Sequence, residues 1–150
     1  NFESANTPPQ FRDSFNNGFS AMADVWRING VLCVGTENEL IEVTDKYLQG
    51  AKWWLNCQNQ AAYDYLLAQP RNLYPNVFIF SNVATESSPT VTTSGKTIVP
   101  GTVPIDNNSI VYLPEITDRA MFSTVKLRCF GIASTYCTFI RRMRNEGEWY

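Results

Sequence analysis

The chain has 150 residues, of which 44% are hydrophobic, 13% aromatic and 17% charged. This composition supports one domain with a hydrophobic core and excludes collagen, coiled-coil and charge-rich disordered proteins. Twelve basic and fourteen acidic residues give a net charge of -2, so the chain as a whole has no basic field for nucleic acid. Histidine is absent, which excludes an imidazole base and removes the commonest zinc ligand.

The N-terminal segment is predicted to be a polar arm over residues 1–10, followed by a single mainly β domain over 11–150. Four apolar residues then occur at the spacing of one helical face: Phe11, Phe15, Phe19 and Met22. The Asn-Asn-Gly run at 16–18 disfavours a helix, because all three are poor interior helix residues. The alternative is an extended arm whose aromatic side chains contact a neighbouring chain.

The strongest local pattern is a β-hairpin centred on Asn29 and Gly30. Two β-rich runs, 25–28 and 31–34, flank this pair. Asn-Gly is the preferred type I′ turn, because both residues tolerate a positive φ. The pattern predicts that Ile28 lies opposite Val31 and that Trp26 lies opposite Cys33.

The segment 36–68 fits either a helical insertion or part of a sheet. Residues 40–44 fit a strand and residues 37–48 fit a short helix, whereas 51–57 reads as a strand. Asn59 then fits an N-cap for a helix over 61–68, which ends before Pro70.

Two adjacent tryptophans, Trp53 and Trp54, lie in the strand predicted over 51–57. On a strand they point to opposite faces, so one is expected in the core. The other is a candidate platform for a sugar or a protein partner, because a flat exposed ring buries much area. The alternative is that both rings are covered within the chain.

From residue 75 onward the chain is β in character. Strands are predicted at 77–80 and 109–113, and one or two long strands over 120–141. The stretch 85–108 is rich in Thr, Ser, Pro and Gly, which predicts long surface loops with at most short edge strands. Together these patterns predict a mainly β fold: an antiparallel β-sandwich, jelly roll or barrel with one or two short helices.

The four cysteines are Cys33, Cys57, Cys129 and Cys137. None of them is in C-x-x-C spacing, which disfavours a thiolate zinc site and a redox pair. The favoured interpretation is free, buried cysteines, and two disulfides are the alternative. No metal and no cofactor is expected.

Carboxylates are the main candidates for catalytic chemistry: Glu37, Glu39, Glu42 and Asp45 in one segment, with Asp64 and Asp118 elsewhere. A glycosidase needs two carboxylates about 5–10 Å apart, one of them with a raised pKa. A solvated acidic surface is the favoured interpretation, so the chain is not expected to be an enzyme.

Several features together resemble a coat-protein domain of a small non-enveloped RNA virus. They are the polar N-terminal arm with spaced aromatics, short β-runs between Thr, Ser, Asn and Pro loops, scarce lysine and absent histidine. The resemblance is compositional and spread over the whole chain. It implies a non-catalytic shell or projecting domain in the virion that self-associates and presents surface loops to a host receptor. The lack of a basic N-terminal arm favours the projecting domain.

Candidate binding residues on this interpretation are Trp53, Trp54, Thr92, Thr93, Ser94, Asn107 and Asn108, and candidate oligomer contacts are Phe11, Phe15, Phe19, Trp149 and Tyr150. The expected partners are further copies of the chain and a host receptor protein or glycan. No specific nucleic-acid motif and no membrane span is expected. One alternative is a small secreted, extracellular binding module, lectin- or effector-like, with two disulfides. The other is a glycan-acting enzyme that uses a carboxylate pair.

Overall fold

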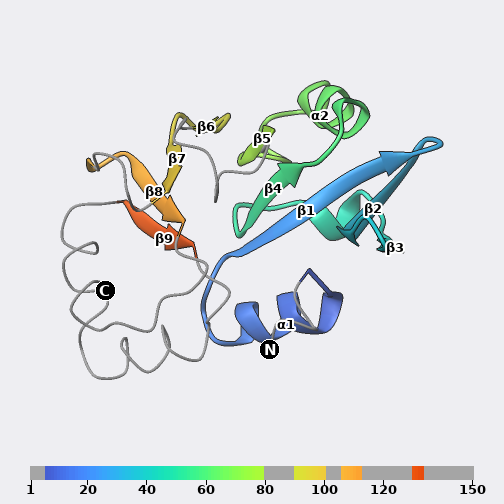
Figure 1. Ribbon diagram of the computed structural model, residues 1–150, viewed down its shortest axis with the longest axis horizontal. Helices are drawn as coiled ribbons and strands as arrows, with labels where there is room; N and C mark the ends of the chain where they lie inside the picture. The colour runs from blue at the N-terminus through green and yellow to red at the C-terminus, as the bar shows by residue number, and fades with distance from the viewer. Residues whose placement is uncertain (1–5, 80–89, 101–105, 113–129, 134–150) are drawn as a thin grey trace. The chain divides into compact units, whose positions relative to one another are not determined.

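The computed structural model describes residues 6–79, 90–100, 106–112 and 130–133. These residues belong to two compact units. The N-terminal unit contains residues 6–79 and 92–94, and the C-terminal unit contains the other described residues. Each unit holds one β-sheet, and two short α-helices complete the described fold (Figure 1). The predicted mainly β class with one or two short helices is confirmed.

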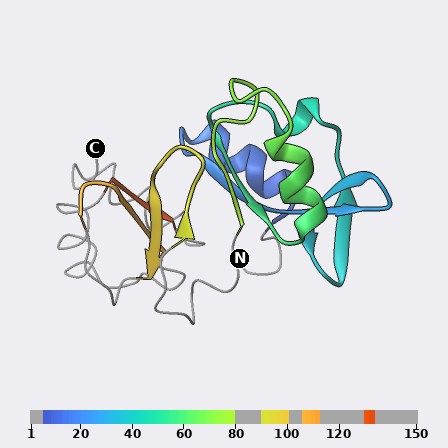
Figure 2. The same cartoon turned by 90° about the horizontal axis from the view of Figure 1, so that it is seen from above.

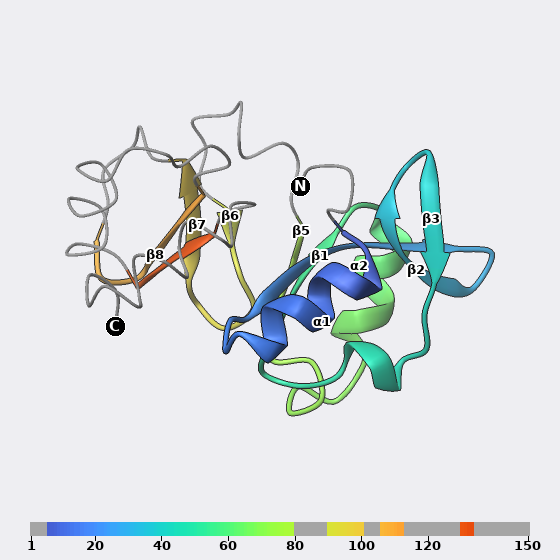
Figure 3. The same cartoon turned by 90° about the horizontal axis from the view of Figure 1, so that it is seen from below.

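The N-terminal unit is built on a five-stranded sheet with the strand order β3-β2-β1-β4-β5. Its strands are β1 (Ala21–Ile28), β2 (Val31–Thr36), β3 (Glu39–Glu42), β4 (Trp53–Cys57) and β5 (Val77–Ile79). Its helices are α1 (Pro8–Asn16), the short 3₁₀-helix η2 (Lys46–Leu48) and α2 (Gln60–Leu67). Both α-helices contact the long strand β1 (Figure 3).

The β1–β2 hairpin has the predicted register. Ile28 pairs with Val31, and Trp26 pairs with Cys33. Asn29 and Gly30 have φ values of 51° and 79°, as a type I′ turn requires. The hairpin prediction is therefore confirmed at the level of individual residue pairs.

The predicted antiparallel arrangement is wrong for several strand pairs. In the N-terminal unit, β4 runs parallel to both β1 and β5. The physical reason for the second pair is α2, which follows β4, contacts β1 and β5 and returns the chain so that β5 starts in the same direction as β4 (Figure 2). Parallel pairs also join β7 to β8 and β8 to β9 in the C-terminal unit. The described strands form open sheets, and the predicted barrel is not among them.

The helix predicted over the spaced aromatics is shorter than expected. Pro8 and Pro9 lie at its first positions, where proline is tolerated because the missing N–H has no helical partner. The helix ends at Asn16, since Gly18 adopts a φ of 78° and the Phe19 N–H bonds the Ser14 carbonyl across the turn. The expectation that Phe19 and Met22 share this helix is wrong.

The segment 36–68 contains both a sheet extension and a helix. β3 and η2 occupy the stretch that fitted either a strand or a helix, and β4 follows as predicted. Asn59 caps α2 as predicted: its Oδ1 accepts a hydrogen bond from the Ala62 N–H at 3.0 Å. The same side chain bonds the backbone N–H and C=O of Arg27, which fixes the start of α2 to β1.

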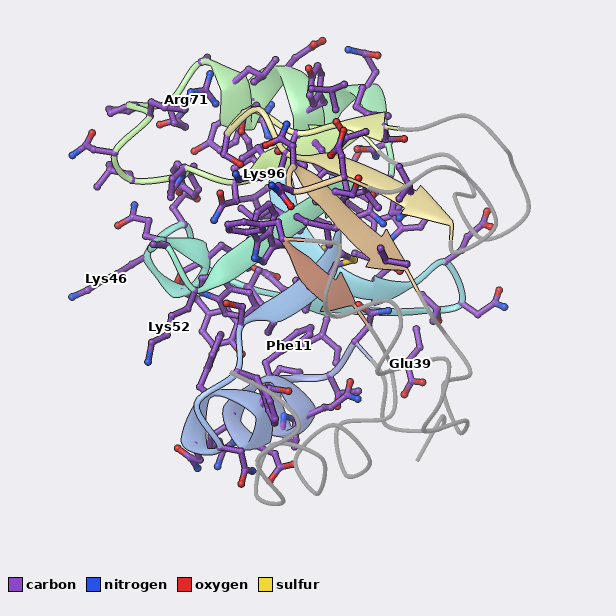
Figure 4. All side chains as sticks on the ribbon, turned by 90° about the vertical axis from the view of Figure 1, so that its left-hand side faces the viewer. Phe11, Glu39, Lys46, Lys52, Arg71 and Lys96 are labelled. Atoms are coloured by element: carbon purple, nitrogen blue, oxygen red, sulfur yellow. The ribbon has the colours of Figure 1, made fainter. Side chains whose placement is uncertain are left out.

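The hydrophobic core of the N-terminal unit lies on one face of its sheet. β1 and β4 each bury alternate residues, Ala21, Ala23 and Val25 on the first and Trp53, Leu55 and Cys57 on the second. Phe11 of α1, together with Ala62 and Leu66 of α2, joins the same core cluster. Phe11 lies between its helix and the sheet, whereas Lys46 and Lys52 extend away from the ribbon (Figure 4). Part of the segment expected as an arm, residues 8–10, thus belongs to a helix that packs on the core.

The C-terminal unit contains a four-stranded sheet with the order β6-β7-β8-β9. Its strands are β6 (Thr90–Val91), β7 (Thr97–Pro100), β8 (Ser109–Tyr112) and β9 (Gly131–Ala133). The expectation that 85–108 holds only loops and edge strands is wrong, because β7 pairs on both sides. The buried Ile98 and Val99 account for its inner position. Of the strands predicted over 120–141, only the part at β9 lies within the described residues.

Candidate interaction surface

The sheet of the N-terminal unit has a second face, opposite the core, that carries apolar side chains. On β1 this face contains Met22, Asp24, Trp26 and Ile28, and the pairing register adds Val31 and Cys33 of β2, Leu40 and Glu42 of β3, Trp54 and Asn56 of β4, and Phe78 of β5. We call this set the Trp26 face.

The outer part of the Trp26 face exposes large apolar side chains. Ile28, Val31 and Leu40 are 41%, 36% and 37% exposed. Trp26 is half-buried, and its indole Nε1–H donates to the Gly35 carbonyl at 3.0 Å. Ile28 and Val31 are paired at the end of the hairpin, and exposed apolar side chains gathered on one face are of the kind that marks an interaction site. The exposed Glu42, opposite Cys33, separates them from Leu40.

The centre of the Trp26 face is a cluster of amides around one carboxylate. Asp24 Oδ1 accepts a hydrogen bond from Asn56 Nδ2 at 2.7 Å, and Asp24 Oδ2 accepts one from Asn6 Nδ2 at 3.0 Å. Asn56 is 1% exposed, and its Oδ1 has no hydrogen-bond partner. The cluster therefore places a largely buried acid among neutral donors, with an apolar side chain before and after it on β1.

Burial raises the pKa of Asp24 above the ordinary aspartate value. Loss of hydration disfavours the charged carboxylate, and this effect exceeds the opposing effect of hydrogen bonds from Asn56, Asn6 and Gln58. Because the pKa is higher in the folded state than in the unfolded state, the folded state holds this proton more tightly. The stabilisation from Asp24 is complete below the unfolded pKa and is lost as the pH rises through the folded pKa.

We expect Asp24→Asn to remove this part of the pH dependence of stability. The free energy of unfolding of the variant, minus that of the unsubstituted chain, should increase as the pH is raised from about 4 through the raised pKa. Guanidinium unfolding at a series of pH values measures this difference. The same substitution at the exposed Asp64 is the control, and an equal slope for both variants would contradict the assignment.

The two adjacent tryptophans point to opposite faces, as predicted. Trp53 is buried in the core, where its ring contacts those of Phe11, Phe15 and Tyr47. Trp54 is half-buried on the Trp26 face. Of the pair, only Trp54 is placed to contact a partner.

The candidate oligomer contacts within the described residues differ in how much of their side chains is exposed. Phe11 is 2% exposed and packs edge-on against Trp53, with 5.1 Å between ring centroids, so little of its surface is left for a second chain. Phe15 packs against the same indole at 4.9 Å and is half-buried, as is Phe19. Trp149 and Tyr150 lie outside the described residues.

The predicted recognition residues Thr92, Thr93 and Ser94 have structural contacts. Thr92 is buried, and its hydroxyl lies 2.9 Å from that of the exposed Ser94. Thr93 makes two hydrogen bonds to the outer edge of β5. Its backbone N–H donates to the Val77 carbonyl, and its hydroxyl oxygen accepts from the Val77 N–H. This tripeptide therefore covers a sheet edge, which sequence patterns of loop residues do not reveal.

Asn107 and Asn108 lie in an exposed turn before β8, where surface recognition residues were predicted. Asn108 also ties this turn to the one before β7. Its Nδ2 donates to the Gly95 carbonyl at 2.6 Å, and its Oδ1 accepts from Lys96 Nζ at 3.1 Å. Of these two residues, Asn108 links the two turns through its side chain and Asn107 does not.

The thiols of the N-terminal unit are unpaired. Cys33 and Cys57 are free cysteines, as the favoured interpretation predicted, and Cys129 and Cys137 lie outside the described residues. Burial raises the pKa of Cys57 to about 12, so this thiol is an unreactive core group. Cys33 is half-buried on the Trp26 face, and burial together with the nearby Glu42 raises its pKa.

The acidic candidates of the segment 37–45 are largely solvated. Glu37, Glu39 and Glu42 are exposed, whereas Asp45 accepts a short hydrogen bond from the Tyr65 hydroxyl. Among the residues that the structure describes, no group of three or more acidic or cysteine side chains could hold a metal ion. No helix in the same part of the chain is long and apolar enough to cross a membrane. Asp118 lies outside the described residues.

Comparison with protein-family models, with curated proteins and with solved structures gave no match. A function for this chain is therefore inferred from the surface itself. Asp24, Asn56 and the aliphatic residues of the Trp26 face were not predicted from the sequence as functional residues. The alternation along β1 carried the signal, since Met22, Asp24, Trp26 and Ile28 share one face, while the other face begins with three small residues at 21, 23 and 25.

Proposed function

We propose that this chain is a non-catalytic interaction domain that self-associates through the Trp26 face. The observation that carries the proposal is the exposure of Ile28, Val31 and Leu40 on one face of one sheet. Burial of such a patch is favourable at roughly 25 cal/mol per Å² of apolar surface, which supplies a driving force for association.

A second copy fits this face by its chemistry. In a two-fold dimer the same patch meets itself, so an apolar surface meets an apolar surface. Two acids lie on this face: Asp24 is largely buried and bonded to Asn6 and Asn56, whereas Glu42, opposite Cys33, is exposed. A self-associated arrangement therefore has to leave the Glu42 charge of each copy at the solvated rim of the contact.

The compositional resemblance supports a more specific proposal: a coat-protein domain of a small non-enveloped RNA virus, located in the virion. In that role the domain would present exposed turns, such as the one at Asn107, to a host receptor protein or glycan. A β-sandwich or jelly-roll fold belongs to the same proposal. A secreted module with two disulfides receives less support, because Cys33 and Cys57 are free.

The test is the dissociation constant of the self-associated chain. We expect the double substitution Ile28→Thr, Val31→Thr to weaken association about tenfold, because it removes apolar surface while keeping β-branched side chains in the hairpin. Sedimentation equilibrium over a hundredfold concentration range measures the constant. Val91→Thr is the control, since Val91 is 66% exposed but belongs to the other sheet. A strictly monomeric chain, or equal weakening by both variants, would contradict the proposal.

A further inference from the structure

The five-stranded sheet has one covered edge and one open edge. At the β5 end, Thr93 is hydrogen-bonded to both the N–H and the carbonyl of Val77. At the other end, β3 pairs with β2 on one side. Among the described residues, no segment makes backbone hydrogen bonds to its other side. The outer edge of β3 is therefore available to a further strand.

The pairing register shows which backbone groups point out of this edge. The N–H of Val43, just beyond β3, donates to a β2 carbonyl at 2.9 Å. Hydrogen-bonded and non-hydrogen-bonded residues alternate along an antiparallel pair, so Ile41 and Glu39 also bond β2. Leu40 and Glu42 then direct their N–H and C=O groups away from β2. These four groups are the ones that an added strand would bond.

The side chains along this edge follow the order acid, apolar, apolar, acid over Glu39–Glu42. Both glutamates are exposed, and Glu39 extends away from its strand (Figure 4). Leu40 is 37% exposed, whereas Ile41 is half-buried against the core. An added strand would place one of its own side chains beside each of these four.

The two acids disfavour a second copy of β3 as the added strand. In an antiparallel pair of two β3 strands in register, Glu39 of each copy lies opposite Glu42 of the other. In a parallel pair in register, each glutamate lies beside its own counterpart. Like charges at directly opposite positions are destabilising, whereas opposite charges there are stabilising. The edge is therefore complementary to a strand that carries cations at these two positions.

We propose that the edge of β3 binds an extended peptide segment of another protein with the pattern cation, apolar, apolar, cation. The pattern is the same in both chain directions, so either direction places lysine or arginine beside Glu39 and Glu42 and apolar residues beside Leu40 and Ile41. Backbone hydrogen bonds to Leu40 and Glu42 supply affinity, and the four side-chain pairs supply specificity. The inference concerns the edge of the sheet and does not depend on self-association through the Trp26 face.

The first test titrates the full chain with two blocked synthetic peptides of identical composition, Thr-Lys-Val-Val-Lys-Thr and Thr-Val-Lys-Lys-Val-Thr. We expect the first to bind about tenfold more tightly, because the second loses the matched cross-strand pairs. Isothermal titration calorimetry measures both affinities. With the first peptide at ten times its dissociation constant, hydrogen exchange at the Leu40 and Glu42 amides should slow about tenfold. Exchange at Ile41, which already bonds β2, should not respond in the same way.

The second test compares two double variants with the same change in net charge. Glu39→Lys with Glu42→Lys reverses both charges of the edge and should weaken binding of the first peptide at least about tenfold. Asp13→Lys with Asp64→Lys changes exposed acids on the two α-helices and should weaken it at most about twofold. The denaturant midpoint of each variant verifies that it is folded.

Several results would overturn the proposal: no binding of the first peptide, equal affinity for the two peptides, or binding with unchanged exchange at Leu40 and Glu42. Equal weakening by the two double variants would also overturn it, because net charge alone would then account for binding. Sedimentation equilibrium without peptide measures self-association separately. The proposed function and this inference can therefore fail independently of each other.

Discussion

Gly35→Ala is expected to destabilise the N-terminal unit by about 2–6 kcal/mol, the sum of a strained backbone and an overpacked contact. Gly35 is buried in β2 with a φ of 124°, a region that side-chain-bearing residues rarely adopt. A Cβ atom at this position would lie 2.3 Å from the backbone oxygen of Glu39. Backbone cannot swing aside as a flexible side chain does, so β3 would have to separate from β2.

The matched control is Gly30→Ala in the hairpin turn. Gly30 also has a positive φ, 79°, but a Cβ there would meet nothing within 4 Å. Only the strain of the positive φ remains, so we expect the free energy of unfolding to fall by about 1–2 kcal/mol. Guanidinium unfolding followed by tryptophan fluorescence measures both variants. Equal losses for the two glycines would show that the contact between Gly35 and Glu39 is not as close as the structure places it.

These two glycines also show what the sequence could and could not predict. Gly30 follows Asn29 between two β-rich runs, and this local pattern was sufficient to predict the turn and the register of the strands that it joins. Gly35 carries no such pattern, because its conformation depends on how closely β3 returns to β2. Local chemistry thus predicted the hairpin, and tertiary contact determined the close approach.

The same distinction accounts for the errors in topology and in the candidate site. The cap of α2 was predicted from Asn59, but the parallel pairing of β4 with β1 was not, because it joins segments about thirty residues apart. Asn6 and Asp24 are eighteen residues apart and individually unremarkable in the sequence. Thr93 was predicted to be a loop residue, because the composition of the stretch around it does not indicate the edge of β5 to which it is hydrogen-bonded. Contacts at long sequence separation leave no periodic signal in a single sequence.

Trp53→Ala is expected to cost about 3–5 kcal/mol of stability, as large-to-small substitutions of buried aromatics do. Trp53 is 5% exposed, and the rings of Phe11 and Phe15 pack edge-on against its indole. These two rings are the aromatic side chains of α1, so the substitution removes the surface on which that helix packs. We therefore expect lower helical circular dichroism and faster hydrogen exchange over residues 8–16, in addition to a lower denaturant midpoint.

Trp54→Ala makes the same chemical change one residue along the strand and on the opposite face. Because Trp54 is half-buried, its loss should cost about 1–2 kcal/mol of stability. Its effect should instead fall on self-association, since Trp54 belongs to the Trp26 face and Trp53 does not. The pair therefore separates folding from the proposed self-association: we expect Trp53→Ala to lower the free energy of unfolding more and Trp54→Ala to weaken association more. The reverse order in either measurement would show that the two faces of the sheet have been assigned the wrong roles.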